Sequence, residues 1–250
     1  MKKILCLFSA LTLVLTSCSS DDENAPVEEN LLLPKTEKYS YTSNPDENST
    51  VTYKYDGNKI VSLSYDGEEQ TNFTYTGNLI TKAVYVESYG EGTRTRITTF
   101  TYENNKLKSS LQTNSENAKS IKKTYTYNTN GTITAVSIVT DPTLKKEAQD
   151  SSSILTLDAN GNINKVEAGN FSDTFEYDTK YNPFKNILGY TALLDSDIFD
   201  REVNSTNNIT KVTERTDGVV VGTTTHANTY NSDNYLIKSV SGDETFEYTY

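Results

Sequence analysis

A short unit repeats along most of this chain: an aromatic residue, any residue, tyrosine, a turn built from Asp, Asn or Gly, and then Ile or Leu. Clear copies are Tyr53–Ile60, Phe73–Ile80, Phe100–Leu107 and Tyr125–Ile133, and Leu155–Ile163 keeps the frame with aliphatic residues. Side chains alternate across a strand, so the two aromatic residues of a unit share one face. Turn residues that tolerate positive φ favour tight hairpins. Each unit is therefore predicted to be a β-hairpin.

The spacing of the units predicts how the hairpins assemble. Successive copies lie about 20 to 30 residues apart, which suits two strands with their connections. Partial copies at Phe175–Asp178, Tyr230–Leu236 and Phe246–Tyr250 extend the pattern to the last residue. The total is roughly 15 strands, and a sheet that wide curls or closes. We expect an all-β fold over residues 36–250, a single antiparallel β-meander of hairpins that is curled or closed into a barrel-like sheet.

One segment departs from the repeat and predicts a short helix near residues 183–195. Asn182 suits the N-cap position and Pro183 the first helical position. Gly189 inside the segment weakens a helix. The apolar residues of the segment must cover one mouth or one face of the sheet; they are Phe184, Ile187, Leu188, Leu193 and Leu194.

The first 17 residues have the pattern of a secretory signal peptide. Lys2 and Lys3 precede an apolar run from Ile4 to Leu15. The run is shorter than the roughly 20 apolar residues that a spanning helix needs. Residues 18–35 follow as an acidic and flexible tether.

The residues around Cys18 resemble the lipobox of bacterial lipoproteins, in which the cysteine is acylated and becomes the first mature residue. Here the sequence is Leu15-Thr16-Ser17-Cys18. The acidic cluster Ser19–Glu23 resembles the export signal of Bacteroidota lipoproteins, which implies display on the outer face of the outer membrane. The expected lipidation site is Cys18, and the expected location is the outer membrane with cell-surface exposure.

Charge and cysteine content exclude several functions. Removal of residues 1–17 leaves 21 basic and 34 acidic residues, a net charge of −13. Such a surface repels phosphates, so we expect no nucleic acid partner. Cys6 lies in the signal and Cys18 at the lipid site. The mature fold therefore has no disulfide and no cysteine-based zinc site, and we expect no cofactor.

Two family resemblances rest on these motifs. Units such as Tyr55-Asp56-Gly57 are similar to the YD repeats of Rhs-type shell proteins, although the spacing here is irregular. The lipobox, acidic tether, Tyr-rich hairpins and Lys180-Tyr181-Asn182-Pro183-Phe184 together resemble an uncharacterised family of Bacteroidota surface lipoproteins. That resemblance implies a porin-like barrel formed by a β-meander. It implies no activity and supplies no functional residue, because the shared motifs are structural.

Few residues are candidates for catalysis. His226 is the only histidine, and its neighbours Thr223–Thr225 and Asn228 favour a solvated position on an outer strand face. Paired carboxylates could serve a glycosidase, but solvated surface is the expected role for any one pair in so acidic a chain. The carboxylates considered are Glu68, Glu69, Asp195, Asp197, Asp200 and Glu202.

The segment Asp158–Asn164 offers oxygen atoms at alternate positions, as calcium loops do. Its glycine, Gly161, comes too early for an EF-hand, and Gly169 stands where the twelfth-position glutamate belongs. A hairpin turn explains the same residues, so we expect no metal site.

Three classes of function remain open. The leading one is a noncatalytic surface binding module for glycan or peptide, in which tyrosine rings could stack on a ligand. The alternatives are a structural partner in an envelope assembly and a carboxylate-dependent hydrolase. A membrane-spanning barrel is disfavoured, because the face opposite the tyrosines carries Thr, Lys, Glu and Ser. The expected partners are the membrane, through the lipid, and a glycan, peptide or envelope protein.

Overall fold

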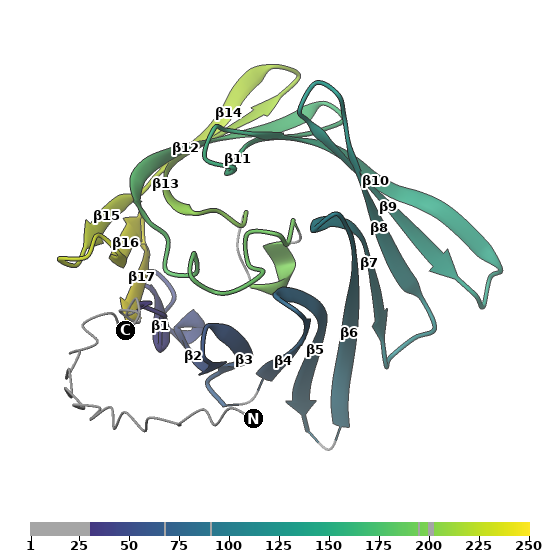
Figure 1. Cartoon of the computed structure of the whole chain (residues 1–250), viewed down its shortest axis with the longest axis horizontal. Coiled ribbons are helices and arrows are strands. Elements are labelled where there is room, and N and C mark those ends of the chain that lie inside the picture. Colours follow the sequence, from purple (N-terminus) through teal and green to yellow (C-terminus); the bar gives the residue numbers. More distant parts are fainter. Residues whose placement is uncertain (1–30, 68, 91, 195, 200–202) are drawn as a thin grey trace, which may run out of the picture. The chain divides into compact units, whose positions relative to one another are not determined.

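The computed structural model describes residues 31–250 except residues 68, 91, 195 and 200–202. The chain divides into residues 1–30 and residues 31–250, and the second unit contains all the described residues. These residues form 17 strands and two short 3-10 helices (Figure 1). The first nine strands are β1 (Thr36–Tyr41), β2 (Ser49–Asp56), β3 (Lys59–Tyr65), β4 (Glu69–Thr76), β5 (Leu79–Tyr89), β6 (Gly92–Glu103), β7 (Lys106–Asn114), β8 (Ser120–Tyr127) and β9 (Ile133–Asp141). The others are β10 (Lys146–Leu157), β11 (Ile163–Ala168), β12 (Phe171–Tyr181), β13 (Asn207–Thr216), β14 (Val219–Thr225), β15 (Ala227–Tyr230), β16 (Leu236–Ser241) and β17 (Glu244–Thr249), with the helices η1 (Pro45–Glu47) and η2 (Ser196–Ile198).

The strands form a nearly closed antiparallel barrel. Each strand from β1 to β13 pairs with the next, β15 to β17 continue the meander, and β17 pairs with β1. β14 and β15 are separated only by His226; β14 pairs with β13, and β15 pairs with β16. The His226 N–H donates to the Thr210 carbonyl at 2.9 Å, so the bent strand still touches β13. The predicted all-β meander is confirmed.

The hairpin turns of the repeat all lie at one end of the barrel. We call this the repeat end; its turns span residues 57–58, 77–78, 104–105, 128–132, 158–162 and 231–235. β1 begins and β17 ends there as well, because the meander alternates in direction. The other connections, such as 217–218 and 242–243, form the opposite end.

A tyrosine hydroxyl links each hairpin to the one before it in most copies of the repeat. Tyr102, Tyr177 and Tyr250 each donate, at 2.7 Å, to the carbonyl of the Ile or Leu that follows the preceding repeat turn. Tyr75 instead accepts from the Ile60 N–H at 3.1 Å. We call these contacts the tyrosine bridges; the acceptors of the first three are Ile80, Ile163 and Leu236. A bridge fixes the stagger between neighbouring hairpins on the inner face.

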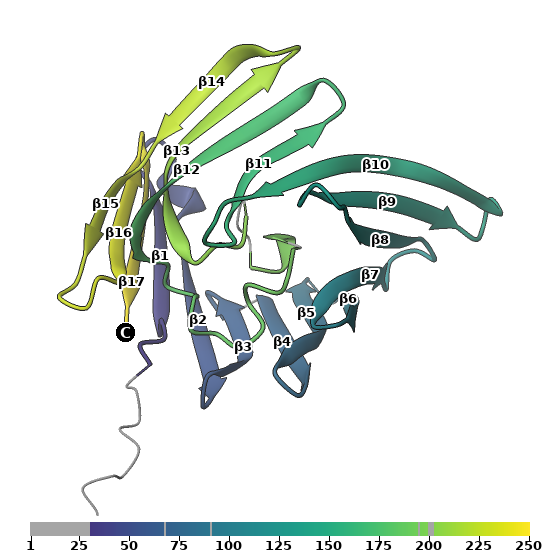
Figure 2. The same cartoon turned by 45° about the horizontal axis from the view of Figure 1, so that its top comes forward.

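The long connection between β12 and β13 folds inside the barrel. Figures 1 and 2 show this inner segment, the described residues of 182–206, surrounded by the strands. Phe184 packs on Tyr53 of β2 and Tyr248 of β17, with ring centroids 5.5 and 6.1 Å apart. Phe199 stacks on Phe73 of β4 at 5.4 Å. The inner segment therefore completes the core with side chains that the sheet itself does not provide.

The helix expected near residues 183–195 is wrong in detail. The segment winds as successive turns with hydrogen bonds from residue i+3 to residue i, such as Ile187 N–H to Phe184 at 2.9 Å, and its helical part is the short η2. Gly189 adopts a φ of +77°, which ends any right-handed helix there. Instead of continuing a helix, the Leu188 N–H donates to the Asn58 carbonyl at 3.0 Å. Among the described residues, no helix has the length and apolar character to cross a membrane.

Gly189 generates a first prediction. A Cβ atom there would lie 3.0 Å from both the Asn78 carbonyl oxygen and the Ile80 nitrogen. We expect Gly189→Ala to lower the free energy of unfolding by about 2–5 kcal/mol, the sum of left-handed strain and backbone overlap. Gly57→Ala is the matched control, since Gly57 also has positive φ but nothing within 4 Å of its Cβ position. It should lose about 1–2 kcal/mol from strain alone. Equal losses in urea unfolding would contradict the contact.

The tyrosine bridges generate a second prediction. Burial raises the pKa of Tyr75 to about 12 and raises the pKa of Tyr102 and Tyr250 as well. A raised folded pKa means that the fold keeps the proton after the unfolded chain has lost it. Stability is therefore full below about pH 10 and falls as the pH rises further, by about 1.4 kcal/mol per pH unit for each such tyrosine.

Urea unfolding at intervals from pH 8 to 12, with tyrosinate absorbance as a second signal, tests this expectation. The tyrosinate of the bridge tyrosines should appear together with unfolding. Ordinary titration of all tyrosines near pH 10 in a chain that stays folded would show that the bridges do not hold the hydroxyl protons.

Candidate functional site

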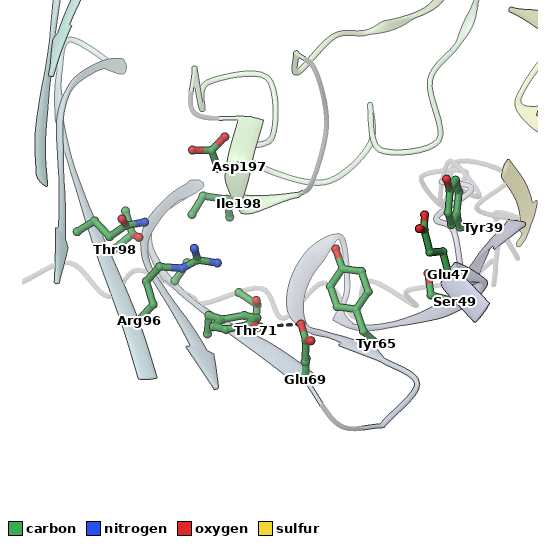
Figure 3. A pocket seen from close by; sticks show the side chains of 13 residues that line it. Tyr39, Glu47, Ser49, Tyr65, Glu69, Thr71, Arg96, Thr98, Asp197 and Ile198 are labelled. Atoms are coloured by element: carbon green, nitrogen blue, oxygen red, sulfur yellow. Dashed lines mark hydrogen bonds between the residues drawn. The ribbon is translucent and has the colours of Figure 1, made fainter. Parts of the chain in front are cut away.

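A polar cavity of about 440 Å³ opens at the opposite end of the barrel. Its walls are inward-facing side chains of β1 to β7 together with residues of η1 and η2 (Figure 3). Three tyrosines, Tyr39, Tyr65 and Tyr85, contribute rings to it. We call it the mouth cavity.

The alternation of the strands places these side chains together. Inward positions of β3, β4 and β5 follow the buried residues Leu63, Thr71 and Ala83. Tyr65 and Tyr85 lie two residues after Leu63 and Ala83, and Glu69 lies two residues before Thr71. All three side chains therefore point to the inner face. Tyr65 pairs directly with Glu69 across the β3–β4 ladder, and Tyr85 pairs with Arg96 across the β5–β6 ladder.

Tyr85 is the centre of a hydrogen-bonded charge network on this wall. Its hydroxyl lies 2.7 Å from Glu69 Oε2 and 3.3 Å from Glu87 Oε2. Arg94 in turn binds Glu87 at 3.2 Å and Glu116 at 3.0 Å. Burial, followed by the bond to Glu69, raises the pKa of the Tyr85 hydroxyl. The tyrosine therefore stays a neutral donor and holds the Glu69 carboxylate in place.

The remaining charges give the mouth cavity an excess of acceptors. Arg96 lies over the Tyr85 ring, 4.7 Å from its centroid, and its guanidinium is exposed to the cavity. Glu47 and Asp197 are exposed carboxylates on other sides. Carboxylates accept hydrogen bonds only, so a ligand with several hydroxyl or N–H donors suits this arrangement.

The inner segment forms the floor of the mouth cavity. Asp197 and Ile198 of η2 face the cavity, as Figure 3 shows. The next residue, Phe199, is buried on the other side against Phe73 and Tyr190. The cavity is thus a recess above an apolar core.

Two of the carboxylates considered from the sequence come together here. Glu69 of β4 and Asp197 of η2 line the same cavity although they are far apart in the chain. Glu68, Asp195, Asp200 and Glu202 lie outside the described residues, as does Cys18. Lipidation at Cys18 stays a prediction.

The oxygen-rich segment Asp158–Asn164 forms a hairpin turn. The Asp158 carboxylate accepts from the backbone N–H groups of Asn160 and Asn162, at 2.8 and 2.9 Å. Asn162 is 0% exposed, and its side-chain oxygen accepts from the N–H and the hydroxyl of Thr206, both at 2.8 Å. These oxygens are engaged in joining β11 to the end of the inner segment. In the described part of the chain, no group of three His, Cys, Asp or Glu side chains is placed to hold a metal.

The position expected for His226 is wrong. The sequence favoured a solvated outer face, but His226 is half-buried and faces the barrel interior. The alternation itself is regular here: Thr224, His226, Asn228 and Tyr230 share the more buried face, and Tyr230 packs against the core. The polar neighbours of His226 therefore gave the wrong face.

Sequence reasoning also missed Tyr39, Tyr85 and Arg96. None of them belongs to a copy of the repeat. Tyr85 could have been found two residues after Ala83, but alternation counted from Ile80 fails because a bulge lies between Ile80 and Lys82. Arg96 could have been placed on the inner face by alternation back from Phe100 through Thr98, but only the β5–β6 register places it beside Tyr85.

Comparison with known proteins supports the fold. No family model matches the sequence, and neither does any curated protein. A solved structure described as a porin-like protein from Bacteroides vulgatus matches with a TM-score of 0.57 and 11% identity, over 88% of this chain and 99% of that one. A porin-like protein from Bacteroides uniformis matches with a TM-score of 0.46 and 13% identity, over 86% and 96% of the two chains, which is too distant to carry an argument. The chain thus shares the barrel fold of the first protein.

Proposed function

We propose that this protein is a noncatalytic binding protein of the bacterial envelope, in which the mouth cavity holds a polar ligand such as a glycan or peptide. The observation that carries the proposal is the cavity itself. It combines three tyrosine rings with Glu47, Glu69 and Asp197 as acceptors and Arg96 as a donor. A recess with a few convergent polar groups is the usual form of a ligand site.

The charges of the mouth cavity favour ligands rich in donors. Sugar hydroxyls and peptide N–H groups can donate to the carboxylates, while an aromatic ring offers a flat surface for the apolar face of a sugar. The bond from Tyr85 to Glu69 holds one acceptor in a fixed position before the ligand arrives. Such preorganisation reduces the entropy lost on binding.

The outer face of the barrel supports a position in water and not in lipid. Its strands carry cross-strand ion pairs on the side opposite the core: Lys108–Glu103, Lys211–Glu176 and Lys238–Glu247, at 3.1, 2.8 and 3.2 Å. Membrane-spanning barrels instead present an apolar band to the acyl chains. We therefore propose a water-exposed barrel held at the outer membrane by acylated Cys18, and the likeness to a porin-like Bacteroides protein is compatible with an envelope location.

A second candidate function is that of a structural partner in an envelope assembly. An apolar surface lies beside the 217–218 turn, where Phe171, Val219, Val220 and Val221 are 59, 66, 52 and 63% exposed. Exposed apolar clusters of this kind often mark protein contacts. This observation favours assembly if the mouth cavity proves to bind nothing.

The mouth cavity generates a third prediction. In a glycan and peptide screen with the full chain, we expect a ligand whose affinity falls about tenfold in Glu69→Gln and in Arg96→Gln, because each loses a charged hydrogen bond. Lys211→Gln, on the outer face, is the control and should bind as the wild type does. If the ligand is unaffected by both cavity variants, its site lies elsewhere. No binding at all, together with co-purification of an envelope protein that Val220→Lys abolishes, would favour assembly.

The anchor generates a fourth prediction. Cys18→Ser removes the thiol that the lipid would modify, so the protein should move from the membrane fraction to the soluble fraction. Ser17→Ala is a suitable comparison, since it keeps the cysteine and a small residue before it. Fractionation followed by immunoblotting measures both, and a Cys18→Ser protein that remains in the membrane fraction would overturn the anchor.

A further inference from the structure

The strand β14 extends beyond the neighbour that its continuation uses. Residues 219–225 pair with β13 along one side. After His226 the strand continues as β15, which pairs with β16 on its other side. Ala227 lies opposite Val240, so β16 ends opposite His226 and β14 runs on past that end (Figure 2). The second side of residues 219–225 therefore lies beyond β16, and we call it the free edge.

The ladder with β13 shows which backbone groups of β14 face the free edge. The His226 N–H donates to the Thr210 carbonyl at 2.9 Å, so the backbone of this residue points toward β13. Hydrogen-bonded and non-hydrogen-bonded pairs alternate in an antiparallel ladder, and the register over residues 222–225 has no bulge. The N–H and C=O groups of Thr223 and Thr225 therefore point to the free edge. Such a row of backbone donors and acceptors is a template for a further strand.

The residues of β14 lack the features that usually protect an edge. Natural edge strands carry charges or proline, or lie beneath a loop or helix. Residues 219–225 have the sequence VVVGTTT, without a charge or a proline, and each of the three valines is more than half exposed. Branched side chains of this kind pack well against those of a paired strand. The free edge is therefore suited to the addition of another strand.

A notch at the end of the free edge indicates the charge of that strand. It has a volume of about 630 Å³ and lies between Thr223–Thr225 and the turn that joins β16 to β17. Its charged lining residues are Asp243 and Glu244, and both are exposed. Asp243 accepts from the Ser43 hydroxyl, and Glu244 accepts from the Tyr39 hydroxyl at 3.2 Å. A carboxylate has room for further donors, so a lysine or arginine fits the notch.

A second copy of this chain fits the free edge less well. If two β14 strands paired antiparallel about Gly222, the 217–218 turn of one copy would lie beside Thr225 of the other. Asp217 would then approach Asp243 and Glu244 in the notch, and like charges repel. The charge of the notch favours a basic partner instead.

We propose that β14 binds an extended peptide, which adds to the free edge as an antiparallel strand and places a lysine or arginine against Asp243 and Glu244. Since β14 runs toward the notch, the basic residue lies near the N-terminal end of such a peptide. Backbone hydrogen bonds supply the affinity in this mode of recognition, and the side chains supply the specificity. The inference concerns a different surface from the mouth cavity and does not depend on the proposed function.

Three forms of one labelled peptide, Lys-Thr-Val-Thr-Val-Thr with both ends blocked, test the proposal with the full chain. The first is unmodified, the second is N-methylated at every second residue, and the third at every residue. Methylation removes N–H donors and keeps the side chains. The second form keeps one complete edge, so fluorescence anisotropy should show an affinity within about threefold of the first. The third should bind at least about tenfold more weakly, because it loses at least two hydrogen bonds. Equal binding of all three forms, or no binding of the first, would overturn the proposal.

Three variants locate the peptide on β14. Thr223→Pro removes a donor of the free edge and keeps the bonds to β13, so the unmodified peptide should bind at least about fivefold more weakly. Asp243→Asn should weaken binding about threefold, and a peptide with glutamine in place of lysine should not sense this change. Lys108→Gln, on β7, should bind as the wild type does.

The two kinds of experiment are independent, since the methylated peptides need only the wild-type chain and still decide the matter if Thr223→Pro does not fold. Unchanged peptide binding by a folded Thr223→Pro protein would overturn the proposal. Sedimentation would overturn it as well if the wild type were a dimer that Thr223→Pro dissociates, because the free edge would then belong to a second copy.

Discussion

The tyrosine bridge is the interaction on which the rest of the barrel depends. A ladder of backbone hydrogen bonds joins neighbouring strands. Hydrophobic alternation repeats every second residue, so by itself it would allow the register of two paired strands to shift by two residues. A buried tyrosine hydroxyl must find a partner, and in Tyr102, Tyr177 and Tyr250 that partner is a single carbonyl in the preceding hairpin. One long side chain therefore sets the stagger of each hairpin on its neighbour. Accumulated stagger of this kind is what allows a wide sheet to close. In the aliphatic copy of the repeat, Leu157 occupies the tyrosine position and has no hydroxyl. There the packing of Leu155 and Ile163 in the core holds the stagger of the hairpin.

The hairpins could be predicted from the sequence because their causes are local. The aromatic alternation and the turn residues act within about ten residues, as in Phe73–Ile80. The inner segment could not be predicted in the same way. Asn182 and Pro183 are residues that favour the start of a helix. However, the Leu188 N–H donates to the Asn58 carbonyl, and the Leu188 carbonyl accepts from the Tyr75 hydroxyl. Both partners lie more than 100 positions away in the sequence. Long-range hydrogen bonds from the barrel wall outweigh the local helix preference.

The candidate site was partly predictable for a related reason. The repeat indicates which faces of β3 to β5 point inward, so Glu69 could be placed. The mouth cavity also needs the register of β6 and the return of η2 into the barrel, and neither has a sequence signal. His226 shows the limit of local polarity as a guide. Its threonine and asparagine neighbours favour an outer face, whereas alternation from Tyr230 through Asn228 places His226 on the inner face, where the structure has it.

The repeat end holds both the first residue of β1 and the last residue of β17, whereas the mouth cavity opens at the other end. This arrangement gives the molecule a polarity. A barrel held through acylated Cys18 would be attached at its repeat end, because residues 18–35 lead into β1 there. A chain of that length spans at most about 60 Å when fully stretched. The bilayer would then lie on the side of the repeat turns, and ligands would approach the recess from the side facing away from the membrane without any reorientation of the barrel.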